Sequence, residues 1–149
     1  MYKLVAIDLD GTLLDPYGQI SLKDKQIIQE AIQKKVEIVL ATGRSIASTI
    51  NFSKEIGAEH YFISGNGAVI YDLQNEKILY NHYLPREKVI EIVEFCEKNS
   101  MYYTVFTDNA IITKSLNYNT LFYYYENRNK EDGKKTQINI IEDIPLYIK

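Results

Sequence analysis

Two carboxylates that lie two residues apart follow a short apolar segment near the start of the chain. Leu4–Ile7 is apolar throughout, and residues 8–12 read Asp-Leu-Asp-Gly-Thr. Both carboxylates can face one ligand where such a strand ends, and the glycine permits the turn that follows. In phosphoryl transfer, one carboxylate can attack phosphorus while the other protonates the leaving oxygen. These residue types predict a phosphoryl-transfer site with Asp8 and Asp10 as its catalytic pair.

Two anions beside a phosphate also need a cation. Mg²⁺ takes hard oxygen ligands, usually keeps several waters, and neutralises charge shared between carboxylates and phosphate. The segment therefore predicts a magnesium site at Asp8 and Asp10. The alternative interpretation of the same residues is an acidic turn at the end of a strand.

Two further segments place polar groups directly after apolar strands. Residues 41–44 read Ala-Thr-Gly-Arg, so a hydroxyl, a backbone amide and a guanidinium stand at the start of a helix, where anions bind. Residues 64–68 read Ser-Gly-Asn-Gly-Ala. Alone, the first segment is a helix cap with a surface charge and the second a tight turn. Beside residues 8–12, we interpret them as phosphate-binding and substrate-side residues: Thr42, Gly43, Arg44 and Asn66.

Alternating strands and helices must position these segments. The predicted strands are 4–7, 36–41 and 61–64, and the predicted helices are 22–34, opened by a capping Ser21, and 46–57, closed by Gly57. Helices of this length between strands imply right-handed crossovers and one parallel sheet. Because the carboxyl ends of parallel strands meet at one edge of the sheet, ligands bind there. The fold class is therefore α/β, with a Rossmann-like parallel-sheet core.

The pattern changes after residue 67. The sequence predicts a β-hairpin at 68–71 and 77–80, a helix from Pro85 to about 99, strands at 102–107 and 110–113, a helix at 116–127, and a strand at 137–141. Residues 127–136 are polar and predict an exposed loop. We therefore expect two domains, a core at 1–84 and a smaller α+β domain at 85–149.

Bulk composition is that of an ordinary globular protein. The 149 residues are 46% hydrophobic and 25% charged, with a formal net charge of −3, so neither nucleic acid nor an anionic membrane is an expected partner. One cysteine, Cys96, cannot form an internal disulfide and fits a buried core thiol. The start of the chain fits neither a signal peptide nor a membrane span, so we expect a cytoplasmic protein.

The segment Asp8-Leu9-Asp10-Gly11-Thr12-Leu13-Leu14 resembles the first motif of the haloacid dehalogenase (HAD) superfamily. The Thr-Gly-Arg segment at residues 42–44 and the Asn-Gly-Ala segment at residues 66–68 resemble the Cof-like branch of this superfamily, which carries a type IIB cap domain. The resemblance covers nearly all of residues 1–84, and residues 85–149 resemble the cap more loosely. It implies an incomplete HAD core followed by a partial α+β cap.

The resemblance also implies roles for individual residues. Asp8 would be the nucleophile, and Asp10 the general acid and base, lending its backbone carbonyl to magnesium. The Leu9 backbone would help to hold the phosphoryl oxygens, and Thr42 would be the second motif, with the Gly43 amide beside it. The family's third-motif lysine and fourth-motif acidic pair normally follow the cap. Two acidic pairs, Glu131-Asp132 and Glu142-Asp143, and the lysine Lys149 lack that pattern.

The function that follows is a Mg²⁺-dependent phosphatase of small phosphorylated metabolites, with sugar phosphates as the expected class, acting through an aspartyl-phosphate on Asp8. Two alternatives stay open: a phosphomutase, and a non-catalytic fragment that binds a partner. Because the third and fourth motifs are missing, we expect a weakly active or inactive chain. In the family, the strand that bears the acidic pair lies beside the first strand. We therefore expect residues 4–7 to line an open sheet edge that self-associates or pairs with the missing C-terminal half.

Overall fold

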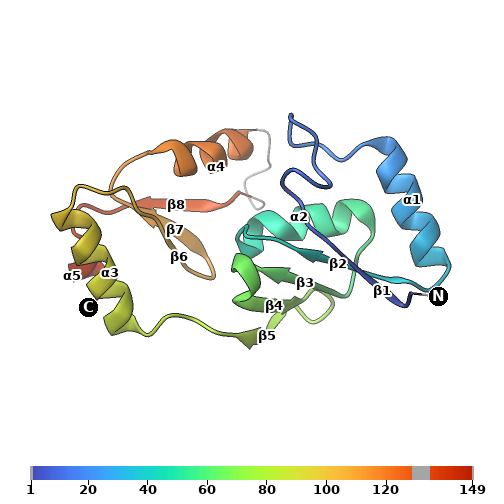
Figure 1. The fold of residues 1–149 in the computed structure, drawn as a ribbon, viewed down its shortest axis with the longest axis horizontal. Helices are drawn as coiled ribbons and strands as arrows, with labels where there is room; N and C mark the ends of the chain where they lie inside the picture. The colour runs from blue at the N-terminus through green and yellow to red at the C-terminus, as the bar shows by residue number, and fades with distance from the viewer. Residues whose placement is uncertain (1, 129–134, 149) are drawn as a thin grey trace. The chain divides into compact units, whose positions relative to one another are not determined.

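The computed structural model describes residues 2–128 and 135–148, so the expected loop segment with Glu131-Asp132 and the terminal Lys149 lie outside the described residues. The chain divides into two compact units, one ending at His82 and the other beginning at Tyr83 (Figure 1). None of the helices in the described part of the chain is long and apolar enough to cross a membrane.

A five-stranded sheet forms the centre of the first unit (Figure 1). Its order is β1 (Leu4–Ile7), β2 (Glu37–Ala41), β3 (Tyr61–Ser64), β4 (Val69–Asp72) and β5 (Lys77–Asn81). The first three strands are parallel, and the β4–β5 hairpin joins them in antiparallel pairing. The predicted α/β fold with a parallel sheet is confirmed, and the carboxyl ends of β1, β2 and β3 lie at one edge.

Two helices connect the parallel strands. α1 (Leu22–Gln33) begins after Ser21, whose hydroxyl accepts a hydrogen bond from the Asp24 amide at 3.1 Å. α2 (Ile46–Ile56) ends at Gly57, which takes the left-handed conformation with φ 74°. α1 packs on β2, α2 packs on β2 and β3, and the two helices touch each other. They therefore cover the same face of the sheet.

The core of the first unit lies between this face and the helices. Buried side chains come from both helices, from the strands, and from the segment that follows β1: Leu9, Leu13, Leu14, Ile20, Ile28, Ile38, Leu40, Ile56, Ala58 and Phe62. Phe62 also stacks on Tyr71 with ring centroids 5.1 Å apart. Because three leucines of the loop belong to the core, apolar burial fixes the backbone of the loop that carries the carboxylates.

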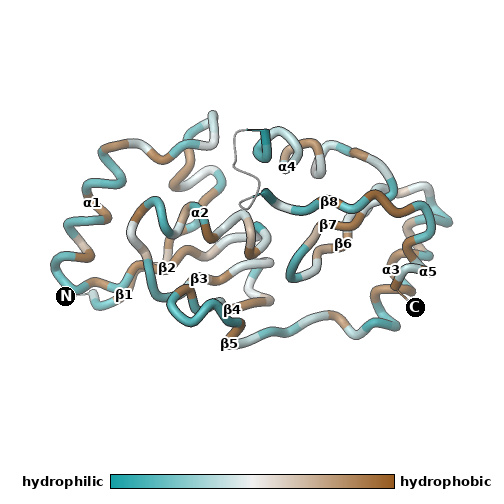
Figure 2. Tube along the Cα trace, turned by 180° about the vertical axis from the view of Figure 1, so that it is seen from behind, coloured by the Kyte–Doolittle hydropathy of each residue, from teal (hydrophilic) through white to brown (hydrophobic). Residues whose placement is uncertain are grey.

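β1 differs from the other parallel strands in its exposure. Its apolar run predicts a strand buried on both faces, yet Leu4 is 54% and Val5 39% exposed. Figure 2 shows hydrophobic positions in both β1 and β2. These side chains are exposed because β1 forms the edge of the sheet. Among the described residues, β1 pairs only with β2. This arrangement agrees with the open edge that the family resemblance implies.

The second unit is a small α+β structure, with six helices and strands among its described residues. They are α3 (Arg86–Lys98), β6 (Val105–Phe106), β7 (Ala110–Thr113), α4 (Tyr118–Arg128), β8 (Gln137–Ile140) and α5 (Ile144–Ile148). β7 lies between antiparallel β6 and parallel β8. β6 is much shorter than the predicted 102–107, and α5 was not predicted at all. β8 pairs with β7 in this sheet.

Apolar packing and one polar cluster stabilise the second unit. Val93, Ile112 and Ile144 form its core, and Cys96 is buried as predicted. The Glu97 carboxylate accepts a hydrogen bond from the Tyr103 hydroxyl at 2.6 Å and pairs with Lys114 at 2.9 Å. These two contacts lower the pKa of Glu97, whereas burial and the neighbouring carboxylate raise the pKa of Tyr103.

Candidate active site

The loop after β1 exposes two carboxylates on either side of a buried leucine. Leu9 is fully buried, and its carbonyl accepts hydrogen bonds from the amides of residues 12, 13 and 14 at 3.3, 3.0 and 2.9 Å. Gly11 turns the chain in the left-handed conformation at φ 75°. Asp8 and Asp10 are both exposed. Burial of the residue between them therefore fixes the backbone from which both side chains project.

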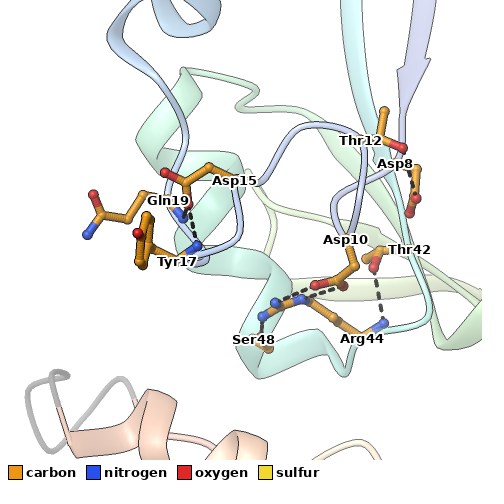
Figure 3. A network of polar contacts seen from close by, with 9 residues as sticks. All are labelled: Asp8, Asp10, Thr12, Asp15, Tyr17, Gln19, Thr42, Arg44 and Ser48. Atoms are coloured by element: carbon orange, nitrogen blue, oxygen red, sulfur yellow. Dashed lines mark hydrogen bonds and ion pairs between the residues drawn. The ribbon is translucent and has the colours of Figure 1, made fainter.

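Thr12 is a member of the site that the sequence analysis did not assign. Its hydroxyl donates a hydrogen bond to Oδ2 of Asp8 at 3.3 Å (Figure 3). A threonine four residues after the first carboxylate was visible in the segment, but its spacing alone did not indicate this contact. The hydroxyl restrains the Asp8 carboxylate on one side.

Arg44 lies inside the first unit and not on its surface. The residue is only 4% exposed, and its guanidinium makes two hydrogen bonds of 2.8 Å to the carboxylate of Asp10 (Figure 3). A third donor, Nη1, reaches the Ser48 hydroxyl at 3.1 Å. The structure therefore links two predicted site residues that are 34 positions apart in the sequence.

The loops after β2 and β3 are joined through their backbones. The Thr42 amide donates to the carbonyl of Ile63 at 3.0 Å, and the Thr42 carbonyl accepts from the Asn66 amide at 3.2 Å. The Gly65 amide donates to the carbonyl of Arg44 at 3.0 Å. The Thr42 hydroxyl is buried and accepts the Arg44 amide at 3.2 Å. The predicted phosphate-binding and substrate-side segments thus form one interlocked structure.

The parallel pairing brings this structure next to the first carboxylate. Ile7 of β1 is opposite Leu40 of β2, so Asp8 follows one strand at the same level at which Ala41 and Thr42 end the other. Neighbouring strands lie about 4.8 Å apart. The backbones of the first and second predicted motifs are therefore adjacent at the carboxyl edge of the sheet, as expected from the sequence. Binding of phosphate by this group of residues stays a prediction.

Asn66 covers Gly43. Residues 65–67 form a 3-10 turn in which Asn66 takes the left-handed conformation, with φ 57° and ψ 36°. A Cβ atom added to Gly43 would lie 2.7 Å from Oδ1 of Asn66, which is closer than real Cβ contacts allow. A side chain at position 43 therefore fits only if the Asn66 side chain moves.

Substituting alanine for Gly43 should displace Asn66 and destabilise the first unit, by about 1–3 kcal/mol, because overpacking forces side chains out of their rotamers. Asn66→Gly removes the obstructing amide and accepts φ 57° without strain. In the double variant, thermal or urea unfolding should therefore recover most of the Gly43→Ala loss. Additive losses in a double-mutant cycle would show that the two residues do not meet in this way.

The described residues fit part of a magnesium site. Asp8 presents an exposed carboxylate, whereas the Asp10 carboxylate is engaged by Arg44. Over residues 2–128 and 135–148, no group of three His, Cys, Asp or Glu side chains is arranged to hold a metal. Glu142-Asp143 does not supply one, because Asp143 caps α5 through the Leu146 amide at 2.9 Å. The donors fit an ion shared between one carboxylate and a phosphate, and not a cage built by these residues alone.

The second unit has a hollow of about 280 Å³ at the end of α3. Tyr102 and Tyr103 line it together with the Glu97–Lys114 ion pair. Tyr102 is 86% exposed, so it does not belong to the core of this unit. Two neighbouring tyrosines therefore have different environments, and the hydroxyl of Tyr103 is held by Glu97.

Comparison with known proteins identifies relatives along most of the chain. The family model of haloacid dehalogenase-like hydrolases matches residues 5–147. The chain is 38% identical to phosphatase YwpJ of Bacillus subtilis over 112 residues, 74% of this chain and 39% of that protein. It is 30% identical to HMP-PP phosphatase of Serratia proteamaculans over 78 residues, 52% of this chain and 28% of that protein.

A solved structure gives the same result for the fold. A haloacid dehalogenase-like hydrolase from B. subtilis superposes with a TM-score of 0.78 at 26% identity, covering 97% of this chain and 56% of that one. The chain thus spans less than two thirds of the length of each of these proteins.

Proposed function

The chain belongs to the haloacid dehalogenase-like hydrolase family. We propose that it functions in a magnesium-dependent phosphatase of small phosphorylated metabolites, with sugar phosphates as the expected substrate class. The observation that carries the proposal is the pair of exposed carboxylates, Asp8 and Asp10, at the carboxyl end of β1. Relatives that bear the name phosphatase support it. The substrate of one of them, HMP-PP, belongs in any test of specificity.

The reaction proceeds in two steps. An oxygen of the Asp8 carboxylate attacks phosphorus, the bond from phosphorus to the ester oxygen breaks, and Asp10 gives that oxygen its proton. Water then attacks the phosphorus of the aspartyl-phosphate and loses a proton to Asp10. The bond to Asp8 breaks, and both carboxylates return to their starting states with inorganic phosphate released.

Neighbouring groups support these steps. Thr12 restrains the Asp8 carboxylate through its hydroxyl. The amide of Gly43 and the hydroxyl of Thr42 stand at the adjacent strand end, where hydrogen-bond donors stabilise the oxygens of a transferring phosphoryl group. Magnesium, when bound at the Asp8 carboxylate and the Asp10 backbone carbonyl, would neutralise the negative charge that carboxylates and phosphate share.

Two other functions stay open: one uses the same nucleophile, and the other is not catalytic. A phosphomutase would pass the phosphoryl group from Asp8 to a second substrate hydroxyl, and product analysis separates it from a phosphatase. A non-catalytic module would bind a partner that supplies the remaining groups.

The first test is hydrolysis of p-nitrophenyl phosphate and a panel of sugar phosphates with magnesium. We expect the 149-residue chain to turn over far more slowly than about 1 per second, a typical rate for an enzyme. Extension through the family's third and fourth motifs should restore turnover, and chelation by EDTA should remove it. A 149-residue chain that reaches the typical rate would show that the missing motifs are not needed.

A further inference from the structure

We infer that Arg44 is a positioning residue that orients the carboxylate of the proton-transferring Asp10. The inference rests on the proposed phosphatase function and departs from the assignment of Arg44 to phosphate binding. It begins from the contact itself, in which Nε donates to Oδ2 and Nη2 to Oδ1 of Asp10, both at 2.8 Å. Such paired charge-assisted bonds fix the plane of a carboxylate as well as its position.

The guanidinium is itself held from several sides. Nη1 donates to the Ser48 hydroxyl at 3.1 Å, and the ring of Phe52 lies 5.0 Å from the guanidinium carbon, within range of a cation–π contact. The Arg44 amide donates to the Thr42 hydroxyl and its carbonyl accepts from Gly65. Arg44 is thus a rigid, buried part of the joined loops after β2 and β3.

Asp10 is far more exposed than the arginine that holds it. Its side chain is 55% exposed, whereas that of Arg44 is 4% exposed. A surface carboxylate on a loop samples several rotamers unless a partner selects one. The buried arginine therefore transfers the rigidity of the core to an exposed proton-transfer group.

The clamp leaves Asp10 able to transfer a proton. An ionised carboxylate has about four lone-pair sites, and two hydrogen bonds from Arg44 use one on each oxygen. One of the remaining sites holds the proton that Asp10 gives to the leaving oxygen in the first step and takes back from the attacking water in the second. Arg44 directs its Nε and Nη2 donors at Asp10 and Nη1 at Ser48, so these contacts orient the carboxylate of Asp10.

The test compares the Arg44→Lys variant with wild type in the natural full-length protein. Lysine keeps the charge but loses the two-pronged contact, so kcat should fall about 10- to 100-fold, as expected for a misplaced catalytic group. A sugar phosphate, whose alkoxide needs a proton to leave, should lose more kcat/KM than p-nitrophenyl phosphate. Arg86→Lys, at the exposed first residue of α3, is the matched control and should keep wild-type activity.

Two further variants separate positioning from general destabilisation. Adding Arg44→Lys to Asp10→Asn should cause little additional loss, because the lost contact no longer serves a proton-transfer group. Ser48→Ala keeps Arg44 but removes the hydrogen bond from its Nη1 to the Ser48 hydroxyl. This variant should also lose more kcat/KM with the sugar phosphate than with p-nitrophenyl phosphate, and both losses should be smaller than in Arg44→Lys. It also provides the measurement if Arg44→Lys does not fold.

The outcomes distinguish the two claims. Equal losses for both substrates, or losses that multiply with Asp10→Asn, would overturn the positioning role while leaving the phosphatase intact. A wild-type protein without magnesium-dependent hydrolysis would overturn the proposed function, and the positioning role with it. In that case NMR would still report the contact between Arg44 and Asp10. The Arg44 Nε–H resonance should be shifted in wild type and should return to the position of an unpaired arginine in Asp10→Asn.

Discussion

Asp8→Asn is expected to abolish phosphatase turnover in the extended, active form of the chain. The amide cannot attack phosphorus, so no aspartyl-phosphate forms, and kcat should fall by roughly 10⁴-fold or more. The fold should persist, because Asp8 is exposed and the loop is anchored by buried Leu9. Steady-state hydrolysis and trapping of the phosphoenzyme measure both consequences.

The matched control is Asp15→Asn, the same substitution seven residues further along. Asp15 accepts the amides of Tyr17 and Gln19 through one oxygen, Oδ1, which asparagine retains (Figure 3). Wild-type rates are expected for this variant. Phosphatase activity that survives in Asp8→Asn would remove the nucleophile from the proposed reaction.

The 149-residue chain by itself is expected to self-associate through β1. Strand edges with unpaired N–H and C=O groups template pairing with another chain, and here the edge is also apolar, with Leu4 54% exposed. Val5→Lys should convert the associated protein to a monomer, because a lysine on an edge strand opposes pairing. Sedimentation velocity over a range of concentrations gives the result directly.

Leu22→Lys serves as the comparison for charge alone. Leu22, the first residue of α1, is 77% exposed, so this variant adds the same charge away from the edge and should stay associated. A chain that carries the family's remaining motifs, in the same molecule or as a second one, should compete for β1. A strictly monomeric wild-type chain with slow amide exchange at Leu4–Ile7 would contradict the expected pairing.

Short-range signals predicted most elements of the fold correctly. The capping Ser21, the left-handed Gly57 and the alternation of apolar strands with helices each act within a few residues. The exceptions have local causes as well. Only two residues of the predicted 102–107 strand pair with β7, and α5 is five residues long with a proline at its second position. Such a short helix offers no periodic pattern to detect.

Sequence patterns could not predict the side-chain contacts between segments that are distant in the sequence. The sequence placed Asp10 and Arg44 at the ends of neighbouring strands, but not which side chain would receive the guanidinium. Thr12 and Ser48 were missed for the same reason, since their contacts depend on rotamers fixed by the core. The apolar run of β1 also looks the same in a central strand and in an edge strand, so exposure followed only from the resemblance to the family.

The joined loops after β2 and β3 have a consequence for protein engineering. Residues 41–44 and 63–67 share three backbone hydrogen bonds and the contact between Gly43 and Asn66. A designer who wishes to graft either loop from a relative in order to change substrate choice would break these contacts by moving one segment alone. The two segments form a single exchangeable module although about twenty residues of helix and strand separate them in the sequence. Chimeras should therefore be cut outside the pair, before β2 and after the 3-10 turn.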